Sequence, residues 1–149
     1  MRKVLIIEDN ETKLERIMDL CSTEFPSYNL VDKRSYNSAQ QEVLFHGNEY
    51  DLILLDVSMN TYEISIDDNG EQEPLAGSKI LRFMKLRKIN TPVIVVTMYE
   101  SFVDGVKIKA LDNRFKTQYN NIYKGYIYYN VKTEDWKVKL ITMIKSLGL

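Results

Sequence analysis

Three carboxylates in this chain follow apolar runs and are placed to form one acidic site. Glu8 and Asp9 come directly after residues 4–7, and Asp56 comes directly after residues 52–55. Three carboxylates that meet without a counter-charge repel each other, so either one stays protonated or a cation joins them. Oxygen ligands favour Mg²⁺, which takes one or two carboxylates and leaves room for phosphate oxygens. This chemistry suits phosphoryl transfer to a carboxylate, with Asp56 as the nucleophile.

The apolar runs before these acids predict the strands that position them. Residues 4–7, 52–55 and 93–96 are continuous apolar runs, and a polar residue follows each of them directly. Such runs are typical of a parallel sheet that helices cover on both faces. In an open α/β sheet the ligand site lies outside the carboxyl ends of the strands. The acids should therefore converge at that edge, where Thr97 ends a neighbouring strand and offers a hydroxyl to a phosphoryl group.

Helical spacing and capping residues separate the predicted strands. We expect helices from the cap Asn10 to Cys21 and over 38–45, 77–88 and 134–147. A further helix is expected inside the weakly patterned residues 99–121. Two more strands are expected at 28–34 and 126–129. The order (βα)₅ predicts an α/β fold, a doubly wound parallel five-stranded sheet, in one domain over residues 1–149.

Composition narrows the class of partner. A net charge of -1 gives no electrostatic reason to expect nucleic-acid binding. Cys21 is the only cysteine, which excludes an internal disulfide and fits a reducing compartment. The apolar runs are too short to span a membrane, and the N-terminus shows no signal-peptide pattern. We therefore expect a cytoplasmic protein without a membrane partner.

Four motifs occur in an order that resembles the receiver domain of two-component response regulators. They are Ile-Ile-Glu-Asp-Asn at 6–10, Leu-Leu-Asp-Val-Ser-Met at 54–59, Ala-Gly at 76–77 and Pro-Val-Ile-Val-Val-Thr at 92–97. The resemblance covers residues 1–100 and implies the flavodoxin-like strand order 2-1-3-4-5. Each motif is weak by itself, because strand-terminal acids are often solvated or cap a helix. The specific signal is the occurrence of all four in the right order.

The resemblance implies a role for each matching residue. Glu8, Asp9 and Asp56, together with the backbone carbonyl of Ser58, would bind Mg²⁺. Asp56 would accept a phosphoryl group from a histidine kinase. Thr97 would move towards that group and report its presence.

Two departures from the receiver pattern bear on this assignment. The separation of Asp56 and Gly77 is longer than in receivers, so the acidic loop at about 58–75 is an insertion beside the site. Receivers also place a lysine at the end of the fifth strand, where it holds a phosphoryl oxygen. Lys124 is one candidate, but a strand at 126–129 puts Tyr129 at that position and Tyr126 at the aromatic switch position. The positive charge then comes from Lys124, from a lysine elsewhere, or from no residue at all.

The leading expectation is a phosphoprotein that works as a response regulator receiver in a two-component phosphorelay. It would take phosphoryl from a histidine kinase or phosphotransfer protein and signal to a downstream protein. The face formed by the fourth helix, fifth strand and fifth helix would carry the output, and it also offers a surface for a homodimer. No enzymatic activity is expected beyond slow self-dephosphorylation.

Two other functions fit parts of the sequence. A receiver-like interaction module that works without phosphorylation would explain Tyr129 at the lysine position. A small phosphatase with an aspartyl intermediate would need a second acid two residues after the nucleophile, and that residue is Ser58. Phosphorylation that depends on Mg²⁺ separates the receiver from the interaction module, and turnover of a phosphate ester would indicate the phosphatase.

Overall fold

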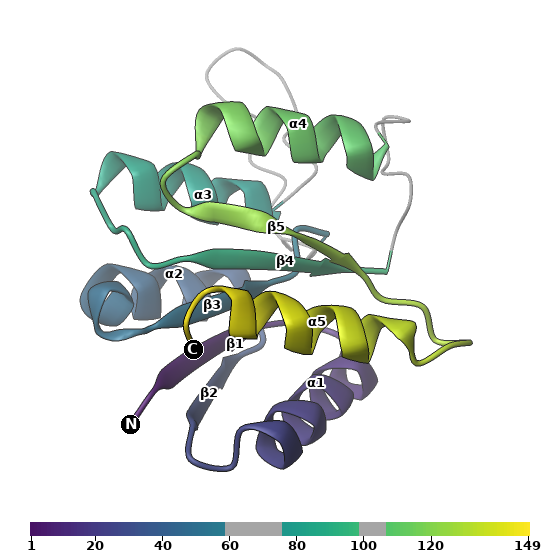
Figure 1. Ribbon diagram of the computed structural model, residues 1–149. Coiled ribbons are helices and arrows are strands. Elements are labelled where there is room, and N and C mark those ends of the chain that lie inside the picture. Colours follow the sequence, from purple (N-terminus) through teal and green to yellow (C-terminus); the bar gives the residue numbers. More distant parts are fainter. Residues whose placement is uncertain (59–75, 99–106) are drawn as a thin grey trace.

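The computed structural model describes residues 1–58, 76–98 and 107–149. Within these ranges, five strands form one parallel sheet in the order β2-β1-β3-β4-β5 (Figure 1). The strands are β1 Lys3–Ile7, β2 Asn29–Lys33, β3 Leu52–Leu55, β4 Val93–Thr97 and β5 Tyr123–Tyr128. The helices are α1 Glu11–Glu24, α2 Tyr36–His46, the 3₁₀ turn η1 Gly47–Glu49, α3 Ala76–Leu86, α4 Ile108–Gln118 and α5 Asp135–Ser146. The predicted fold class and strand order are confirmed.

Helices cover both faces of the sheet, which explains the continuous apolar strands. Figure 1 shows α1 and α5 on one face, with α2, α3 and α4 on the other. Alternate residues of β1 enter two different cores, with Leu5 and Ile7 in the cluster on the α2, α3 and α4 side and Val4 and Ile6 in the cluster on the α1 and α5 side. Strands β3 and β4 are buried along their whole length. A central strand with two buried faces needs apolar side chains at every position.

The first helix follows its predicted cap. The Asn10 side chain accepts a hydrogen bond from the backbone N–H of Lys13 at 3.0 Å, which satisfies a free donor of the first turn. Leu14, Ile17 and Cys21 are buried along one side of α1. Burial raises the pKa of the Cys21 thiol to about 12, so Cys21 is a core residue.

The last strand differs from the prediction. β5 begins at Tyr123 and ends at Tyr128, whereas the sequence indicated residues 126–129. The pairing with β4 shifts between Val93 and Ile94, opposite the start of β5, and Gly125 has a positive φ of 133°. A bulge that contains a glycine breaks the strand pattern in the sequence, because glycine has no side chain to show burial. The expected insertion at 58–75 and the first part of the 99–121 segment fall almost entirely on residues outside the described ranges.

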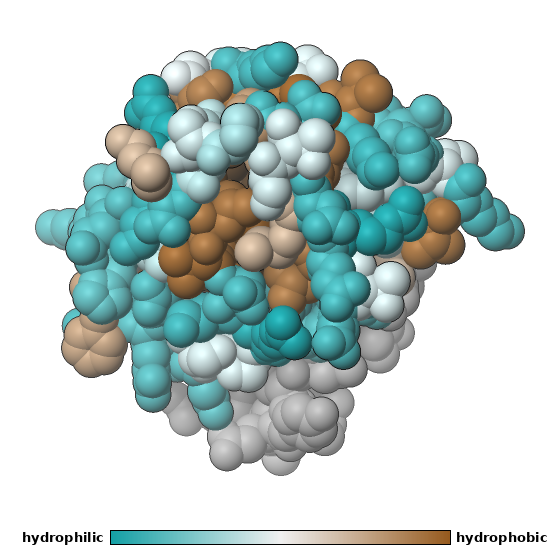
Figure 2. Space-filling view, turned by 90° about the horizontal axis from the view of Figure 1, so that it is seen from below, coloured by the Kyte–Doolittle hydropathy of each residue, from teal (hydrophilic) through white to brown (hydrophobic). Residues whose placement is uncertain are grey.

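The edge of the sheet at β2 is partly apolar. Figure 2 shows the molecule from the side of α1 and β2, and apolar residues gather near the middle of this face. Among the elements on this side, Met18 and Leu20 of α1 and Leu30 of β2 are partly buried against the core. The charged residues Asp32 and Lys33 also belong to β2, and charges on an edge strand oppose pairing with another chain. Among the described residues, every helix is too short or too polar to cross a membrane.

Candidate functional site

The three acids predicted from the sequence lie together at the carboxyl ends of β1 and β3. Ile7 pairs with Leu55 in the sheet, so Glu8 and Asp56 leave neighbouring strands at the same level. One carboxylate oxygen from each of Glu8, Asp9 and Asp56 lies within 4.8 Å of the others. Glu8 and Asp56 are buried, at 1% and 4% exposure, while Asp9 is exposed. We call this cluster the acidic recess, because Glu8 and Asp56 are buried in it and only Asp9 is exposed to solvent.

Hydrogen bonds fix the orientation of the Asp56 side chain. Its backbone N–H donates to the Ile7 carbonyl at 3.0 Å, which holds the end of β3 against β1. The backbone N–H and the hydroxyl of Ser58 both donate to Asp56 Oδ1, at 3.0 and 2.6 Å. Oδ1 is therefore restrained by the turn that follows the strand. Ser58, whose carbonyl was predicted to bind the metal, thus contacts the Asp56 carboxylate through its own N–H and hydroxyl.

A close backbone contact explains Gly77 in the Ala-Gly motif. The N–H of Gly77 donates to the Val57 carbonyl at 3.3 Å, which places the start of α3 directly on the residue after Asp56. A Cβ at position 77 would lie 2.3 Å from the Val57 Cα and 2.6 Å from the Asp56 carbonyl oxygen. No side chain fits there, so glycine allows the helix to approach the strand that carries Asp56.

Thr97 ends β4, the strand next to β3, and Tyr126 lies on β5, one strand further from Asp56. Leu55 pairs with Val95 in the sheet, so Thr97 ends β4 at the same edge as the acids, and it is completely buried. Tyr126 pairs with Val95 from β5 and packs partly buried against the core under α2, α3 and α4. The two residues predicted for the switch thus follow Asp56 across the sheet, and Tyr126 packs on the side that α4 covers.

Tyr129 and Lys124, the two candidates for the lysine position, lie at opposite ends of β5. Tyr129 follows the strand directly, and its N–H donates to the Thr97 carbonyl at 2.7 Å, so it is level with the site. Lys124 is exposed and lies next to Tyr123, which pairs with Val93 at the start of β4. Lys124 thus lies near the end of the sheet opposite Asp56.

A lysine that the sequence reasoning missed brings a positive charge to the recess. Lys13 of α1 is 1% exposed, and its Nζ lies 2.5 Å from Glu8 Oε1 and 3.8 Å from Asp56 Oδ1. The same ammonium donates to the Val96 carbonyl at 2.7 Å. A buried ammonium is costly unless it is paired, and these contacts supply the pairing. One sequence signal was available, because Lys13 lies four residues before Ile17 and so interrupts the apolar side of α1.

The recess remains short of positive charge despite Lys13. Burial raises the pKa of Glu8 to about 8, and the neighbouring Asp56 adds to the rise, while Lys13 opposes it. Bringing carboxylates together out of water disfavours their charged forms. A divalent cation would relieve the repulsion and release the proton. The all-oxygen donor set of Glu8, Asp9 and Asp56 fits Mg²⁺.

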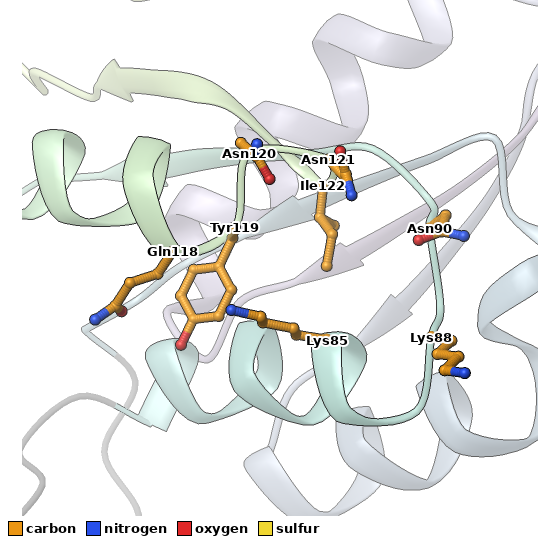
Figure 3. A pocket seen from close by; sticks show the side chains of 8 residues that line it. All are labelled: Lys85, Lys88, Asn90, Gln118, Tyr119, Asn120, Asn121 and Ile122. Carbon is orange, nitrogen blue, oxygen red and sulfur yellow. The ribbon is translucent and has the colours of Figure 1, made fainter.

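A second hollow in the structure is unrelated to these acids. A pocket of about 310 Å³ lies between the ends of α3 and α4 (Figure 3). Asn90 precedes β4 and Ile122 precedes β5, so the pocket is at the amino ends of the strands, opposite the acidic recess. Figure 3 shows Lys85 pointing towards the ring of Tyr119, and the ammonium is 5.8 Å from the ring centre. Its lining is polar and carries no carboxylate.

Comparison with known proteins agrees with this geometry. A search of protein-family models finds no match. A curated relative, the Detocs response regulatory protein DtcB of Enterobacter cloacae, is 32% identical over 151 residues, which cover 97% of this chain and 99% of the relative. The chain belongs to the response regulator receiver family. This receiver is also 29% identical to an uncharacterized protein, y4jR, of Sinorhizobium fredii, over 99% of this chain and 97% of that protein.

Solved receiver structures share the fold. A CheY-like response regulator receiver domain protein from Methanospirillum hungatei superposes with a TM-score of 0.60 at 19% identity, over 99% of this chain and 94% of that one. The CheX-CheY complex with BeF₃ and Mg²⁺ from Borrelia burgdorferi gives a TM-score of 0.66 at 16% identity, over 99% of this chain and 90% of the matched chain. At these identities the likeness shows the receiver fold alone. The roles of the site residues rest on the geometry of this chain.

Proposed function

We propose that this receiver accepts a phosphoryl group on Asp56 from a histidine kinase or a phosphotransfer protein, with Mg²⁺ held by Glu8, Asp9 and Asp56. The observation that carries the proposal is the buried Asp56 carboxylate, restrained by Ser58 and within 4.8 Å of two further acids. Ser58 would add its backbone carbonyl to the metal ligands. The turn after β3 keeps that residue next to Asp56.

The proposed step is a displacement at phosphorus. An oxygen of the Asp56 carboxylate forms a bond to the phosphorus of a phosphohistidine, while the bond from phosphorus to the imidazole nitrogen breaks. The released imidazole takes a proton from solvent, and Asp56 becomes an acyl phosphate. Two hydrogen bonds from Ser58 restrain Oδ1, so Oδ2 is the oxygen assigned to the attack. When bound, Mg²⁺ would neutralise charge on the phosphoryl oxygens.

The output step uses the elements beside the recess. The hydroxyl of Thr97 would donate to a phosphoryl oxygen, and Tyr126 on the neighbouring strand would change its packing in response. This change would alter the face formed by α4, β5 and α5, where we place binding of a downstream protein or of a second copy. Tyr126 suits this role because it is only partly buried against the core under α2, α3 and α4.

One observation favours a second candidate, an interaction module that works without phosphorylation. Tyr129 occupies the end of β5 and is 2% exposed, so this strand offers no cation to a phosphoryl group. If Lys13 serves only as a fixed partner of Glu8, the recess would be a structural ion pair. The module would then bind its partner equally well with Asp56 replaced.

Intact mass separates the two functions. The purified protein is incubated with a small phosphoramidate, with and without Mg²⁺, in parallel with Asp56→Asn. The receiver proposal predicts a gain of one phosphoryl group that requires Mg²⁺ and is absent in the variant. Folded wild-type protein that gains no phosphoryl group with Mg²⁺ present would contradict the proposal and favour the interaction module.

A further inference from the structure

We infer that Lys13 of α1 binds the phosphoryl group on Asp56, in place of a lysine at the end of β5. This inference rests on the proposed phosphoacceptor function of Asp56. Its direct basis is the position of the Lys13 ammonium, which is buried in the acidic recess with Nζ 3.8 Å from Asp56 Oδ1. Its stem comes from α1, so the cation enters from the side of the sheet opposite α3 and α4.

The contact distances leave one N–H of the Lys13 ammonium able to donate to a phosphoryl oxygen on Asp56. Nζ is within hydrogen-bond reach of Glu8 Oε1 at 2.5 Å and of the Val96 carbonyl at 2.7 Å. Its separation of 3.8 Å from Asp56 Oδ1 is longer than a hydrogen bond. An ammonium has three N–H donors, and a phosphoryl group adds strong acceptor oxygens beyond the carboxylate. The third donor can therefore bind an oxygen of the group that Asp56 receives.

Tyr129 explains why the cation comes from the helix. The Tyr129 ring is buried against Trp136, with 4.8 Å between the ring centres. The Lys13 ammonium lies 5.8 Å from the centre of the Tyr129 ring, and the Arg16 guanidinium lies 5.9 Å from it. An aromatic face attracts a cation at these distances. The Tyr129 ring, directly after β5, thus packs beside the Lys13 ammonium and keeps it in the acidic recess.

A count of formal charges supports a role beyond packing. Glu8, Asp9 and Asp56 carry three negative charges when all are ionised. One Mg²⁺ and one lysine ammonium balance them, so the recess with both cations is neutral before phosphoryl arrives. An apolar residue at position 13 would complete the helix core and avoid the cost of burying a charge. A contact between the Lys13 ammonium and the bound phosphoryl group would explain why a charge is buried at this position.

The test compares Lys13→Met with Lys124→Met, which removes an exposed lysine at the other end of β5. The phosphorylation rate with a small phosphoramidate at saturating Mg²⁺ is measured by intact mass, and Mg²⁺ affinity by calorimetry. We expect Lys13→Met to lose about 100-fold in rate, as when one preorganised donor to a developing charge is removed. It should bind Mg²⁺ at least as tightly as the wild type, because a competing cation is gone. Lys124→Met should match the wild type in phosphorylation rate and in Mg²⁺ affinity.

A double variant tests the interpretation directly. Lys13→Met with Tyr129→Lys returns a lysine to the end of β5 and should recover at least tenfold of the lost rate. A purely structural role for Lys13 predicts loss of Mg²⁺ binding and rate together, without recovery. If the wild type is phosphorylated on Asp56 and Lys13→Met reacts at the same rate, the inference about Lys13 is overturned while the proposed function stands. Absence of phosphorylation in the wild type would instead overturn the proposed function.

A measurement on the wild-type side chain covers the case in which Lys13→Met does not fold. The ¹⁵N signal of the Lys13 ammonium, assigned by its loss in Lys13→Arg, is followed during addition of beryllium fluoride with Mg²⁺. We expect this signal to shift, while the signal of Lys124 stays in place. An unchanged Lys13 signal, with Asp56 shown to be occupied, would contradict the inference.

Discussion

Replacing Gly77 by alanine should damage both folding and phosphorylation, because the new methyl group would collide with backbone. The added Cβ would lie 2.3 Å from the Val57 Cα and 2.6 Å from the Asp56 carbonyl oxygen. Ordinary van der Waals contact begins at about 3.4 Å, so α3 or the end of β3 must move by about 1 Å. Overpacking of this kind costs about 1–3 kcal/mol. A displacement of about 1 Å at a reacting group can cost about 100-fold in rate.

The assay combines urea unfolding with the phosphoramidate reaction, and Gly47→Ala is the matched control. A Cβ at Gly47 would meet side-chain atoms instead of backbone, the nearest being Ile89 Cγ2 at 2.9 Å. We expect Gly77→Ala to lose about 2–3 kcal/mol of unfolding free energy and at least tenfold in phosphorylation rate. Gly47→Ala should lose less unfolding free energy than Gly77→Ala, because side chains yield more easily than backbone, and it should keep its phosphorylation rate. Wild-type stability and rate in Gly77→Ala would refute the reasoning.

Two further predictions follow from buried titratable groups. Burial raises the pKa of Glu8 to about 8, against about 4.3 in an unfolded chain, so the folded metal-free protein holds an extra proton between these values. Its unfolding free energy should therefore fall by a few kcal/mol as the pH rises from about 5 to about 8. Urea unfolding measures this slope, which should vanish in Glu8→Gln; an equal slope in that variant would contradict the assignment. Burial also raises the pKa of Cys21 to about 12, so iodoacetamide should label it only as fast as the protein unfolds. Rapid labelling of the native protein would show that the thiol is accessible.

The strands and their terminal acids were predictable because a single physical rule places them. Central parallel strands are buried on both faces, so β3 and β4 appear in the sequence as unbroken apolar runs. Each run ends where the chain leaves the sheet, which is where Asp56 and Thr97 stand. Strand order could not be derived from periodicity, and it came from the resemblance to receivers. The sheet confirms that order.

The cation of the site was not predictable from local pattern. Lys13 reaches the recess only because α1 packs on the face of the sheet that α5 also covers, and that arrangement is a property of the fold. The start of β5 was misplaced because Gly125 interrupts the strand pattern in the sequence. The contact between Tyr129 and Lys13 is between residues far apart in the sequence, so no local pattern could have predicted it.

Chemical location of the phosphoryl group tests the central claim most directly. After reaction with a phosphoramidate and Mg²⁺, hydride reduction of the acyl phosphate followed by peptide mapping marks the side chain that carried it. The account predicts one marked position, Asp56, and no mark when Mg²⁺ is omitted. A mark on Glu8 or Asp9, or a phosphoryl group that survives as a stable ester on a hydroxyl, would contradict the account.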